Sequence, residues 1–185
     1  MTFCGTIHMT PIYFMDIISH GLYGGVAFGR KSKISYWKSF FFGIMPDLFS
    51  FGILFALSIL SIASGPDFRS GPPDPSSIPS YVHSLYNVTH SLVIASIVIG
   101  SVWILNDKPF VELFAWPLHI LVDIPTHSNT FFPTPFLWPL SNYSFDGISW
   151  GTSYIFFPNL FVLVCLYIWF YFSRRKMRVH HSENI

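Results

Sequence analysis

Long apolar segments alternate with short polar segments along the chain, and this pattern predicts membrane-spanning helices. A helix that crosses the hydrocarbon core of a bilayer needs about 20 predominantly apolar residues. Five segments approach that length, at residues 11–28, 39–63, 81–105, 110–125 and 151–172. The first and fourth are short, so each can instead be a buried or partly inserted helix. We expect an all-α, polytopic membrane protein with about five transmembrane or membrane-embedded helices in one bundle.

Two segments between the predicted helices lack a helical pattern. Residues 64–80 are rich in Pro, Gly and Ser, which favour turns over regular structure. Residues 127–149 combine Pro with Phe, Tyr and Trp, and aromatic side chains are enriched where a bilayer meets water. We therefore expect an aromatic loop on the outer side of the bundle. The integral-membrane domain is expected over residues 1–178, with a polar C-terminal tail at 179–185.

The basic residues indicate how such a bundle is oriented, because cytoplasmic loops carry an excess of Lys and Arg. If the five spans alternate, nine of the ten basic residues lie on one side of the membrane. Four of them lie between the first two spans, one lies between the third and fourth, and four follow the fifth. Only Arg69 lies on the other side. We expect the N-terminus outside and the C-terminus in the cytoplasm.

Composition supports the membrane assignment and argues against other classes. Of the 185 residues, 51% are hydrophobic and 10% are charged, whereas soluble domains average about 25% charged residues. The formal net charge of +1 gives no reason to expect nucleic acid as a partner. Cys4 and Cys165 are too few and too far apart in sequence for a disulfide framework or a thiolate metal site.

Three Asp residues interrupt the predicted helices, where a charge is costly. A charged side chain at the centre of a spanning helix costs about 2.5–3.5 kcal/mol on insertion scales. Asp16, Asp47 and Asp123 would together cost on the order of 8–10 kcal/mol, which rivals the stability of a typical domain. Protonation, mutual pairing, water or a metal ion must offset this cost.

The spacing of the intramembrane polar residues places several of them on shared helix faces. His20 lies one helical turn after Asp16, and Asp123 lies one turn after His119. His127 continues the second stripe by one more turn, although a proline two residues earlier can loosen the helix there. Each pair therefore presents an imidazole and a carboxylate in one direction.

Four predicted helices offer an inward-capable His, Asp or both, because Asp47 lies in the second and His90 in the third. Facing helices of a bundle build metal sites from such side chains. Imidazole and carboxylate groups without a thiolate suit zinc, manganese or iron. With a rise of about 1.5 Å per residue, these groups can meet between the midplane and the outer surface of the bilayer.

Simpler interpretations compete with a metal site. A single His or Asp in a span often only makes a hydrogen bond to a neighbouring helix, and His83, at a predicted helix start, fits that description. Asp16 can pair with His20 alone. Asp47 follows Pro46, so it can instead begin a helix, where the helix dipole stabilises a carboxylate.

Six short motifs follow one another between residues 19 and 151: "SHGLYGG", "GIMPDLFSF", "THSL", "HILVDIPTHS", "FPTPFLWPLS" and "FDGISWG". In this order they resemble the bacterial membrane-bound metal-dependent hydrolases of the YdjM-like type, also described as LexA-regulated inner-membrane hydrolases. The resemblance implies a metal site formed by His20, Asp47, His90, His119 and Asp123. One position departs from the family pattern. A second His often stands five residues before the "THS" His, but that position is Leu85 here, and His83 lies two residues away.

The resemblance implies a hydrolase of the bacterial inner membrane in which a divalent metal, with zinc favoured, activates water. A fainter similarity to zinc-dependent phospholipase C enzymes favours a phosphoester or another ester of a lipid-like substrate, so membrane lipids are the expected partners. Asp16 would orient the His20 imidazole. His127 and Asp146 would serve as ligand, general acid or loop anchor. The aromatic segment 131–138 would cover the site and touch lipid headgroups.

Two other functional classes remain open at this point. Intramembrane Asp and His residues also form the relays of proton or metal-ion transport proteins. A transport path predicts polar side chains strung from one face of the membrane to the other, whereas a hydrolytic site predicts a compact cluster. The third class is a membrane scaffold, in which substitution of His119 or Asp123 would impair folding and no activity would be lost.

Overall fold

The computed structural model describes residues 11–60, 62 and 73–182, with side chains described from 17 to 173 within these ranges. These residues form seven α-helices and two short 3-10 helices, and they contain no β-strand. The all-α prediction is therefore confirmed for the part of the chain that is described.

The helices follow the predicted apolar segments. Helix α1 spans Pro11–Phe28, the range expected for the first segment. Helix α6 spans Ala115–Thr126 and follows a 3-10 helix, η2, at Val111–Phe114. Helix α7 spans Ser153–Ser182, so it continues into the segment that was expected to be a polar tail.

The second and third predicted segments are each broken into two helices. Helices α2 (Lys33–Ser50) and α3 (Gly52–Ile59) meet at a bend of 67°. Helices α4 (Ser80–Thr89) and α5 (Leu92–Asn106) meet at a bend of 56°. The second bend has a local cause, because the Ser91 side chain accepts a hydrogen bond from the first turn of α5 and so starts a new helix. The segments predicted as spans at 39–63 and 81–105 are therefore bent within their described residues, and each bent pair can still be one span.

Length and apolar character identify fewer candidate spans than the sequence pattern suggested. Within the described residues, α7 alone is long and apolar enough to cross a membrane, over Ser153–Ser173. The number rises to three if each bent pair, α2 with α3 and α4 with α5, is one span. Helix α7 also exposes large apolar side chains along its length, among them Phe157, Phe161 and Ile168. These side chains fit contact with lipid better than contact with water.

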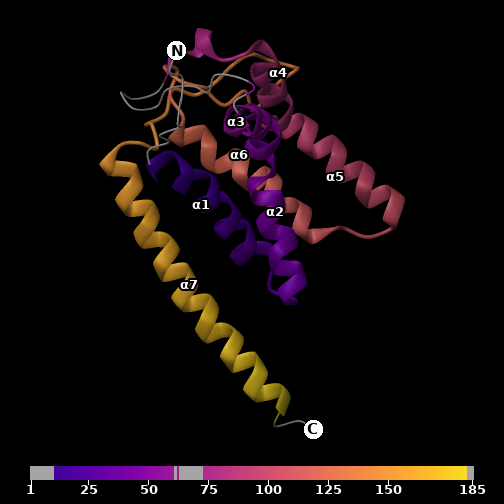
Figure 1. The fold of residues 1–185 in the computed structure, drawn as a ribbon. Coiled ribbons are helices and arrows are strands. Elements are labelled where there is room, and N and C mark those ends of the chain that lie inside the picture. Colours follow the sequence, from indigo (N-terminus) through magenta and orange to yellow (C-terminus); the bar gives the residue numbers. More distant parts are fainter. Residues whose placement is uncertain (1–10, 61, 63–72, 183–185) are drawn as a thin grey trace.

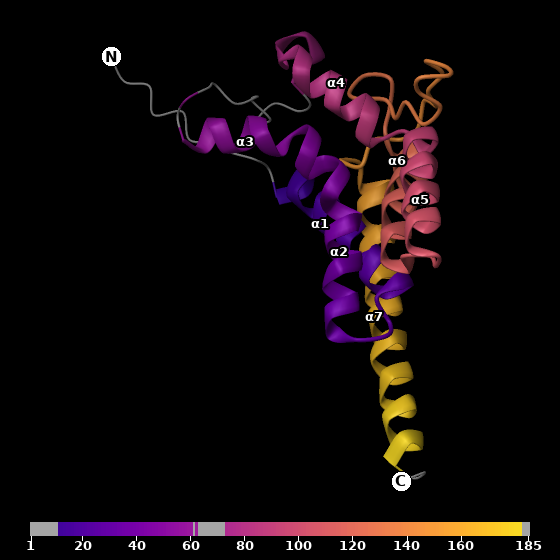
Figure 2. The same cartoon turned by 90° about the vertical axis from the view of Figure 1, so that its right-hand side faces the viewer.

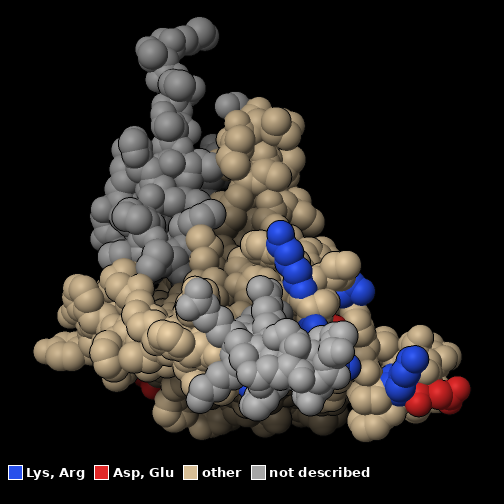
Figure 3. Space-filling model, turned by 90° about the horizontal axis from the view of Figure 1, so that it is seen from below, with Lys and Arg blue, Asp and Glu red and all other residues tan. Residues whose placement is uncertain are grey.

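Helices α1, α2 and α6 pack against one another at the centre of the bundle, with α5 on one side and α7 on the other (Figure 1). Figure 2 shows α7 running past the other helices towards the C-terminus. The α1–α2 turn, the α5–η2 loop and the end of α7 all lie towards this end of the molecule, and Lys and Arg side chains are visible there (Figures 1 and 3). The orientation prediction requires this arrangement, and the orientation itself stays a prediction.

Two apolar cores hold the central helices in place. The first lies between α2, α5 and α6 and is formed by Met45, Ala95, Leu113, Trp116 and Ile120. The second joins α3 and α4 to the loop that follows α6 and is formed by Leu54, Ile78, Val82, Tyr86 and Phe132. The predicted aromatic loop thus contributes Phe132 to the protein interior, in addition to any contact it makes with its surroundings.

A set of hydrogen bonds holds α7 against α1 and α2, and we call it the α7 polar interface. The Tyr23 hydroxyl donates to Asn159 Oδ1 at 2.5 Å, and Asn159 Nδ2 donates to Ser19 Oγ at 3.0 Å. The Tyr167 hydroxyl lies 2.6 Å from that of Tyr36 and donates to a backbone carbonyl of α1 at 3.2 Å. Each of these donors faces an acceptor.

Candidate metal centre

Five of the predicted residues converge where α1, α2, α4 and α6 meet, and we call them the central cluster. It consists of His20 in α1, Asp47 in α2, His90 at the end of α4, and His119 and Asp123 in α6. Four of the five residues are at most 2% exposed, and Asp47, whose side chain is 14% exposed, is the most open. Residues separated by about a hundred positions therefore share one buried polar centre.

Asp123 is the centre of the contacts in this cluster. Its Oδ2 lies 3.0 Å from His119 Nε2, one turn earlier in α6, and 3.4 Å from His90 Nε2. Its Oδ1 lies 3.0 Å from His20 Nε2 and 3.5 Å from His127 Nδ1. One buried carboxylate thus faces four imidazole rings.

Asp47 adds a second carboxylate from helix α2. Its Oδ1 lies 3.3 Å from His90 Nε2 and 3.8 Å from His119 Nε2. The two imidazole nitrogens are themselves only 3.1 Å apart. Helix α2 runs through Pro46 to Ser50, so Asp47 lies near the end of that helix. The alternative in which Asp47 begins a helix is therefore wrong.

A glycine in α2 sets the spacing between the helices at this point. A Cβ on Gly43 would lie 2.5 Å from the backbone carbonyl of His20, so only glycine permits the observed approach of α1 and α2. The carbonyl of Gly43 also accepts a hydrogen bond from His119 Nδ1 at 2.7 Å. The same residue therefore brings His20 close to α2 and orients the imidazole of His119.

The bend between α4 and α5 positions His90. This residue ends α4, and its ring stacks on Tyr86 with 3.7 Å between ring centroids and 20° between planes. Its Nδ1 lies 3.2 Å from the Tyr86 carbonyl and 3.0 Å from the Thr89 hydroxyl. The ring is fixed on one side by these groups, and its other nitrogen points into the cluster.

The backbone partners favour one position for the proton on His90 and His119. A carbonyl oxygen can only accept, so His119 Nδ1, 2.7 Å from the Gly43 carbonyl, is an N–H donor, and the 3.2 Å contact of His90 Nδ1 with the Tyr86 carbonyl favours the same tautomer. In the neutral imidazole, Nε2 then carries a lone pair. Two such lone pairs face each other across 3.1 Å, next to the carboxylate oxygen of Asp123. Acceptors in this arrangement repel one another unless a proton or a metal ion lies between them.

The distances fit a metal ion. Ligand atoms about 2.0–2.1 Å from a tetrahedral zinc ion are about 3.3 Å from one another. The corresponding separations among His90 Nε2, His119 Nε2 and Asp123 Oδ2 are 3.1, 3.0 and 3.4 Å. These three residues form one group that could hold a metal ion, and His20, Asp47 and His119 form another. His119 belongs to both groups, and its Nε2 has one lone pair. It can therefore bind a metal ion in one group or the other, but not in both at once.

The other predicted site residues lie elsewhere or at the edge. The side chain of Asp16 falls outside the part of the chain whose side chains are described. His127 follows α6 and lies at the rim, with an 18% exposed side chain. Asp146 is exposed, and its Oδ1 accepts a hydrogen bond from the Asn129 N–H at 2.8 Å, which anchors the loop. The catalytic roles predicted for these residues stay predictions.

His83, the substitute ligand that the family pattern suggested, lies outside the cluster. Its Nε2 is 3.1 Å from the Pro75 carbonyl, and its ring stacks on Phe132 with 4.6 Å between centroids. These contacts fit the simpler interpretation, in which His83 only bonds to a neighbouring segment and is not a metal ligand. The central cluster therefore forms without it.

Sequence reasoning missed a segment that covers one side of the cluster. The backbone N–H groups of Gly147, Ile148 and Trp150 donate to carbonyls at the end of α6, with distances of 2.8–3.1 Å. The Trp150 ring then lies edge-on to His20, with 5.7 Å between centroids. Gly147 is needed for this approach, since a Cβ there would lie 2.3 Å from the Pro125 carbonyl. The motif "FDGISWG" was the available signal, although it did not indicate this contact.

No family model, curated protein or solved structure matches this chain. The order of the short motifs is therefore the basis of the resemblance to membrane-bound metal-dependent hydrolases.

Proposed function

We propose that the protein is a membrane-bound, metal-dependent hydrolase that acts on an ester, with a phosphoester favoured, of a lipid-like substrate. The observation that best supports a metal site is the arrangement of His90 and His119, whose Nε2 atoms face each other 3.1 Å apart beside Asp123. Imidazole and carboxylate donors without thiolate favour zinc among the divalent metals. The motif order supports the hydrolase activity.

The residues of the cluster have separable roles in this proposal. His90, His119 and Asp123 would hold the metal, with Asp47 or His20 completing the set. When bound, the metal supplies a water molecule whose pKa is lowered towards about 7, and hence a nucleophile at neutral pH. The Gly43 carbonyl keeps the proton of His119 on Nδ1, which leaves Nε2 available as a ligand.

The partly exposed members of the site indicate where substrate would enter. Asp47 and His127 are the least buried of the acidic and imidazole side chains at the cluster. His127 Nδ1 lies 3.5 Å from Asp123 Oδ1 and its side chain is 18% exposed, so we propose this imidazole as the general acid at the rim of the site. Trp150 excludes water on the side of His20. We therefore infer that the substrate approaches past Asp47 and His127.

The membrane setting is part of the proposal. Helix α7 and the two bent pairs are the candidate spans, and α1 with α6 would be embedded between them. If α1 and α6 also cross the bilayer, the five crossings place nine of the ten basic residues on one side, which supports a cytoplasmic C-terminus. The bacterial inner membrane follows from the family resemblance. A lipid-like substrate could then reach the site from within the bilayer.

The compactness of the cluster supports a site over a transport path. A path requires polar side chains at successive depths of the membrane. In the described part of the bundle, the buried imidazole and carboxylate groups of the central cluster meet in one compact group and are not spread along the helices. The alternative of proton or metal-ion transport therefore receives no specific support from the geometry.

Metal analysis of detergent-purified protein tests the proposal directly. We expect about one zinc ion per chain in the wild type and a background level in the double variant His119→Ala/Asp123→Ala, which loses two ligands. The matched control is His83→Ala/Asp74→Ala, which removes the same residue types outside the cluster and is expected to keep its metal. Equal, near-zero metal in all three proteins would contradict the metal site.

Hydrolysis of a fluorescent phospholipid by the same three preparations tests the activity. We expect turnover by the wild type and the control, and none by the variant without ligands. Turnover that persists at the wild-type rate in His119→Ala/Asp123→Ala would show that the cluster is not catalytic. Metal binding without turnover of any ester would leave a metal protein that is not a hydrolase.

A further inference from the structure

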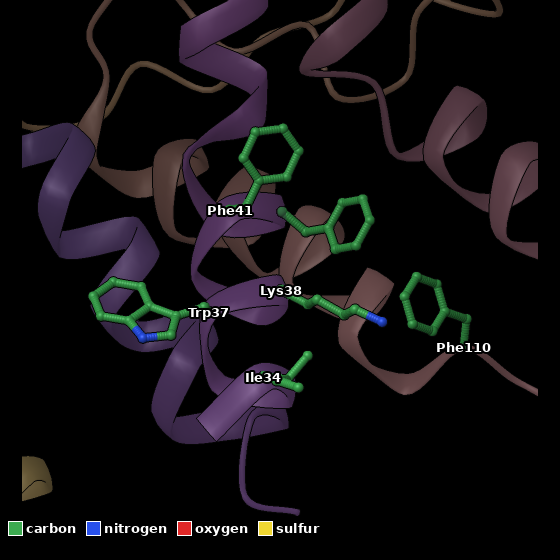
Figure 4. Close-up of a pocket in the computed structure, with 6 residues that line it drawn as sticks. Ile34, Trp37, Lys38, Phe41 and Phe110 are labelled. Atoms are coloured by element: carbon green, nitrogen blue, oxygen red, sulfur yellow. The ribbon is translucent and has the colours of Figure 1, made fainter. Parts of the chain in front are cut away.

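A groove lies along the first half of α2 and ends at Phe42, before the Gly43 contact with the central cluster. It is an open groove of about 420 Å³, and small-molecule sites have volumes of about 300–1,000 Å³. Its walls are formed by Ile34, Trp37, Lys38, Phe41, Phe42 and Phe110 (Figure 4). Five of these six side chains are apolar, so the groove is an apolar surface with a single charge.

That charge is an ammonium group without a carboxylate partner. Lys38 Nζ lies 5.5 Å from the centroid of the Phe110 ring, and Figure 4 shows the side chain extending towards it. Lys38 makes no salt bridge to any acidic residue in the described part of the chain. The nearby Glu112 of η2 instead accepts a hydrogen bond from the Ser35 hydroxyl at 2.6 Å. An ammonium group has three N–H donors, so this one can still bind an anion.

The groove lies at the basic end of the molecule. The turn before α2 carries Arg30 and Lys31, and Figure 3 shows basic side chains on this face. The guanidinium of Arg30 is already engaged, 4.3 Å above the ring of Trp169 in α7. Trp37 is 54% exposed beside Lys38. An exposed Trp next to a Lys on a basic face is the arrangement found where a bilayer meets water.

We propose that this groove binds one anionic phospholipid, with an acyl chain along the aromatic wall and the phosphate against Lys38. The spacing fits, because Phe41 and Phe42 lie about one turn of helix deeper than Lys38. A peptide is a poorer occupant, since its backbone polar groups would find no partners on apolar walls. The proposal rests on the membrane embedding of the proposed function, but it uses no residue of the central cluster.

Native mass spectrometry of the full chain in detergent tests this site. The probes are phosphatidylglycerol and phosphatidylcholine with identical acyl chains. We expect the wild type to retain one phosphatidylglycerol molecule and to prefer it about fivefold over phosphatidylcholine. A fivefold preference corresponds to about 1 kcal/mol, the contribution of one basic residue at an anionic surface. Lys38→Gln should abolish the preference, and Lys38→Arg should keep it. Lys31→Gln, which removes a charge on the same face outside the groove, is the matched control.

Two results of the lipid comparison would overturn the proposal. One is equal retention of the two lipids by the wild type, and the other is an unchanged preference in Lys38→Gln. Inorganic phosphate is added in a separate arm and is expected not to displace the lipid at millimolar concentration. Displacement would mean that the site recognises free phosphate, which also contradicts a lipid site.

Fluorescence locates the acyl chain independently of the headgroup. Phosphatidylglycerol with a brominated chain quenches a nearby tryptophan, so we expect Trp37 to account for a distinct part of the quenching. Trp37→Phe should remove that part, and an identical quenching profile in Trp37→Phe would place the lipid elsewhere. The metal content of each variant is measured in parallel. Because metal binding depends on the central cluster, failure of the lipid site and failure of the proposed hydrolase remain distinguishable.

Discussion

The α7 polar interface and the central cluster both place polar side chains in the apolar bundle. They differ in how hydrogen-bond donors and acceptors are paired. At the interface, the hydroxyl of Tyr23 donates to Asn159, and the hydroxyl of Tyr167 donates to a backbone carbonyl. In the cluster, the Nε2 atoms of His90 and His119 face each other and a carboxylate. The donors named in the first region each have an acceptor within the bundle. The facing acceptors of the second region need a proton or a metal ion between them.

This difference separates polar residues that stabilise a membrane bundle from polar residues that serve a site. Interhelical hydrogen bonds in membranes contribute modestly, about 0.6 kcal/mol on average. A set of facing acceptors is unfavourable by itself and becomes favourable only when a proton or a metal ion lies between them. The two regions should therefore respond in opposite ways to removal of metal and to loss of a hydroxyl group.

The largest effect is expected from metal removal. An ion at 1,000 times its dissociation constant stabilises the protein that binds it by about 4 kcal/mol. A chelator should therefore lower the unfolding temperature of the wild type and of Tyr167→Phe by similar amounts. Asp123→Asn should show no response to the chelator, because the bridging carboxylate is lost. Thermal unfolding followed by tryptophan fluorescence measures all three, and an unresponsive wild type would remove the distinction between the two regions.

The next largest effect is expected at the helix contact that forms the cluster. A methyl group on Gly43 would lie 2.5 Å from the His20 carbonyl, so Gly43→Ala must separate α1 from α2. Overpacking of this kind costs about 1–3 kcal/mol, and the metal content should fall with it. Gly100→Ala in α5 is the control, since a Cβ there meets nothing within 4 Å. Chemical unfolding curves and metal analysis should distinguish the two variants, and equal behaviour would argue against a tight contact at Gly43.

Two buried tryptophans offer a narrower comparison. Trp116 Nε1 donates to the Thr89 carbonyl at 2.6 Å, whereas Trp150 Nε1 has no hydrogen-bond partner among the described residues. Trp116→Phe leaves a buried carbonyl unpaired and should cost about 1–3 kcal/mol. Trp150→Phe loses no such bond and should cost less. The difference in free energy of unfolding measures this hydrogen bond, and a larger loss in Trp150→Phe would reverse the interpretation.

The smallest effect is expected in the α7 polar interface. Tyr167→Phe removes one hydroxyl from a bonded chain and should cost about 0.6 kcal/mol, the average for such bonds in membranes. Its metal content should equal that of the wild type, because the interface takes no part in the cluster. Metal analysis beside an unfolding curve gives both values. Loss of metal in Tyr167→Phe would show that the two regions are coupled.

The members of the central cluster could be predicted because local spacing and polarity identify them. His119 and Asp123 are one turn apart, and their side chains do meet, at 3.0 Å. Charged groups in an apolar bundle must find partners, which brings Asp47 and His20 to the same place. The bounds of α1 were also predicted, since its apolar pattern is uninterrupted except by its polar pair.

The bends and the covering segment could not be predicted from local pattern. The α4–α5 bend depends on the Ser91 cap, a weak signal within an apolar run. Helix α2 continues through Pro46, because one missing backbone hydrogen bond is tolerated in a packed helix. Trp150 reaches His20 through backbone contacts with the end of α6, which only the three-dimensional arrangement reveals. Long-range packing decides each of these features.

The position of α7 in the chain has a consequence for the order of events during synthesis. All five members of the central cluster precede residue 124, whereas the α7 polar interface needs Asn159 and Tyr167. At about 5–20 residues per second, roughly 2–9 s of translation separate Asp123 from Tyr167. Trp150 is also made in this interval. Under the proposed function, a metal ion therefore meets a nascent bundle whose ligands are all present and whose His20 side is still uncovered.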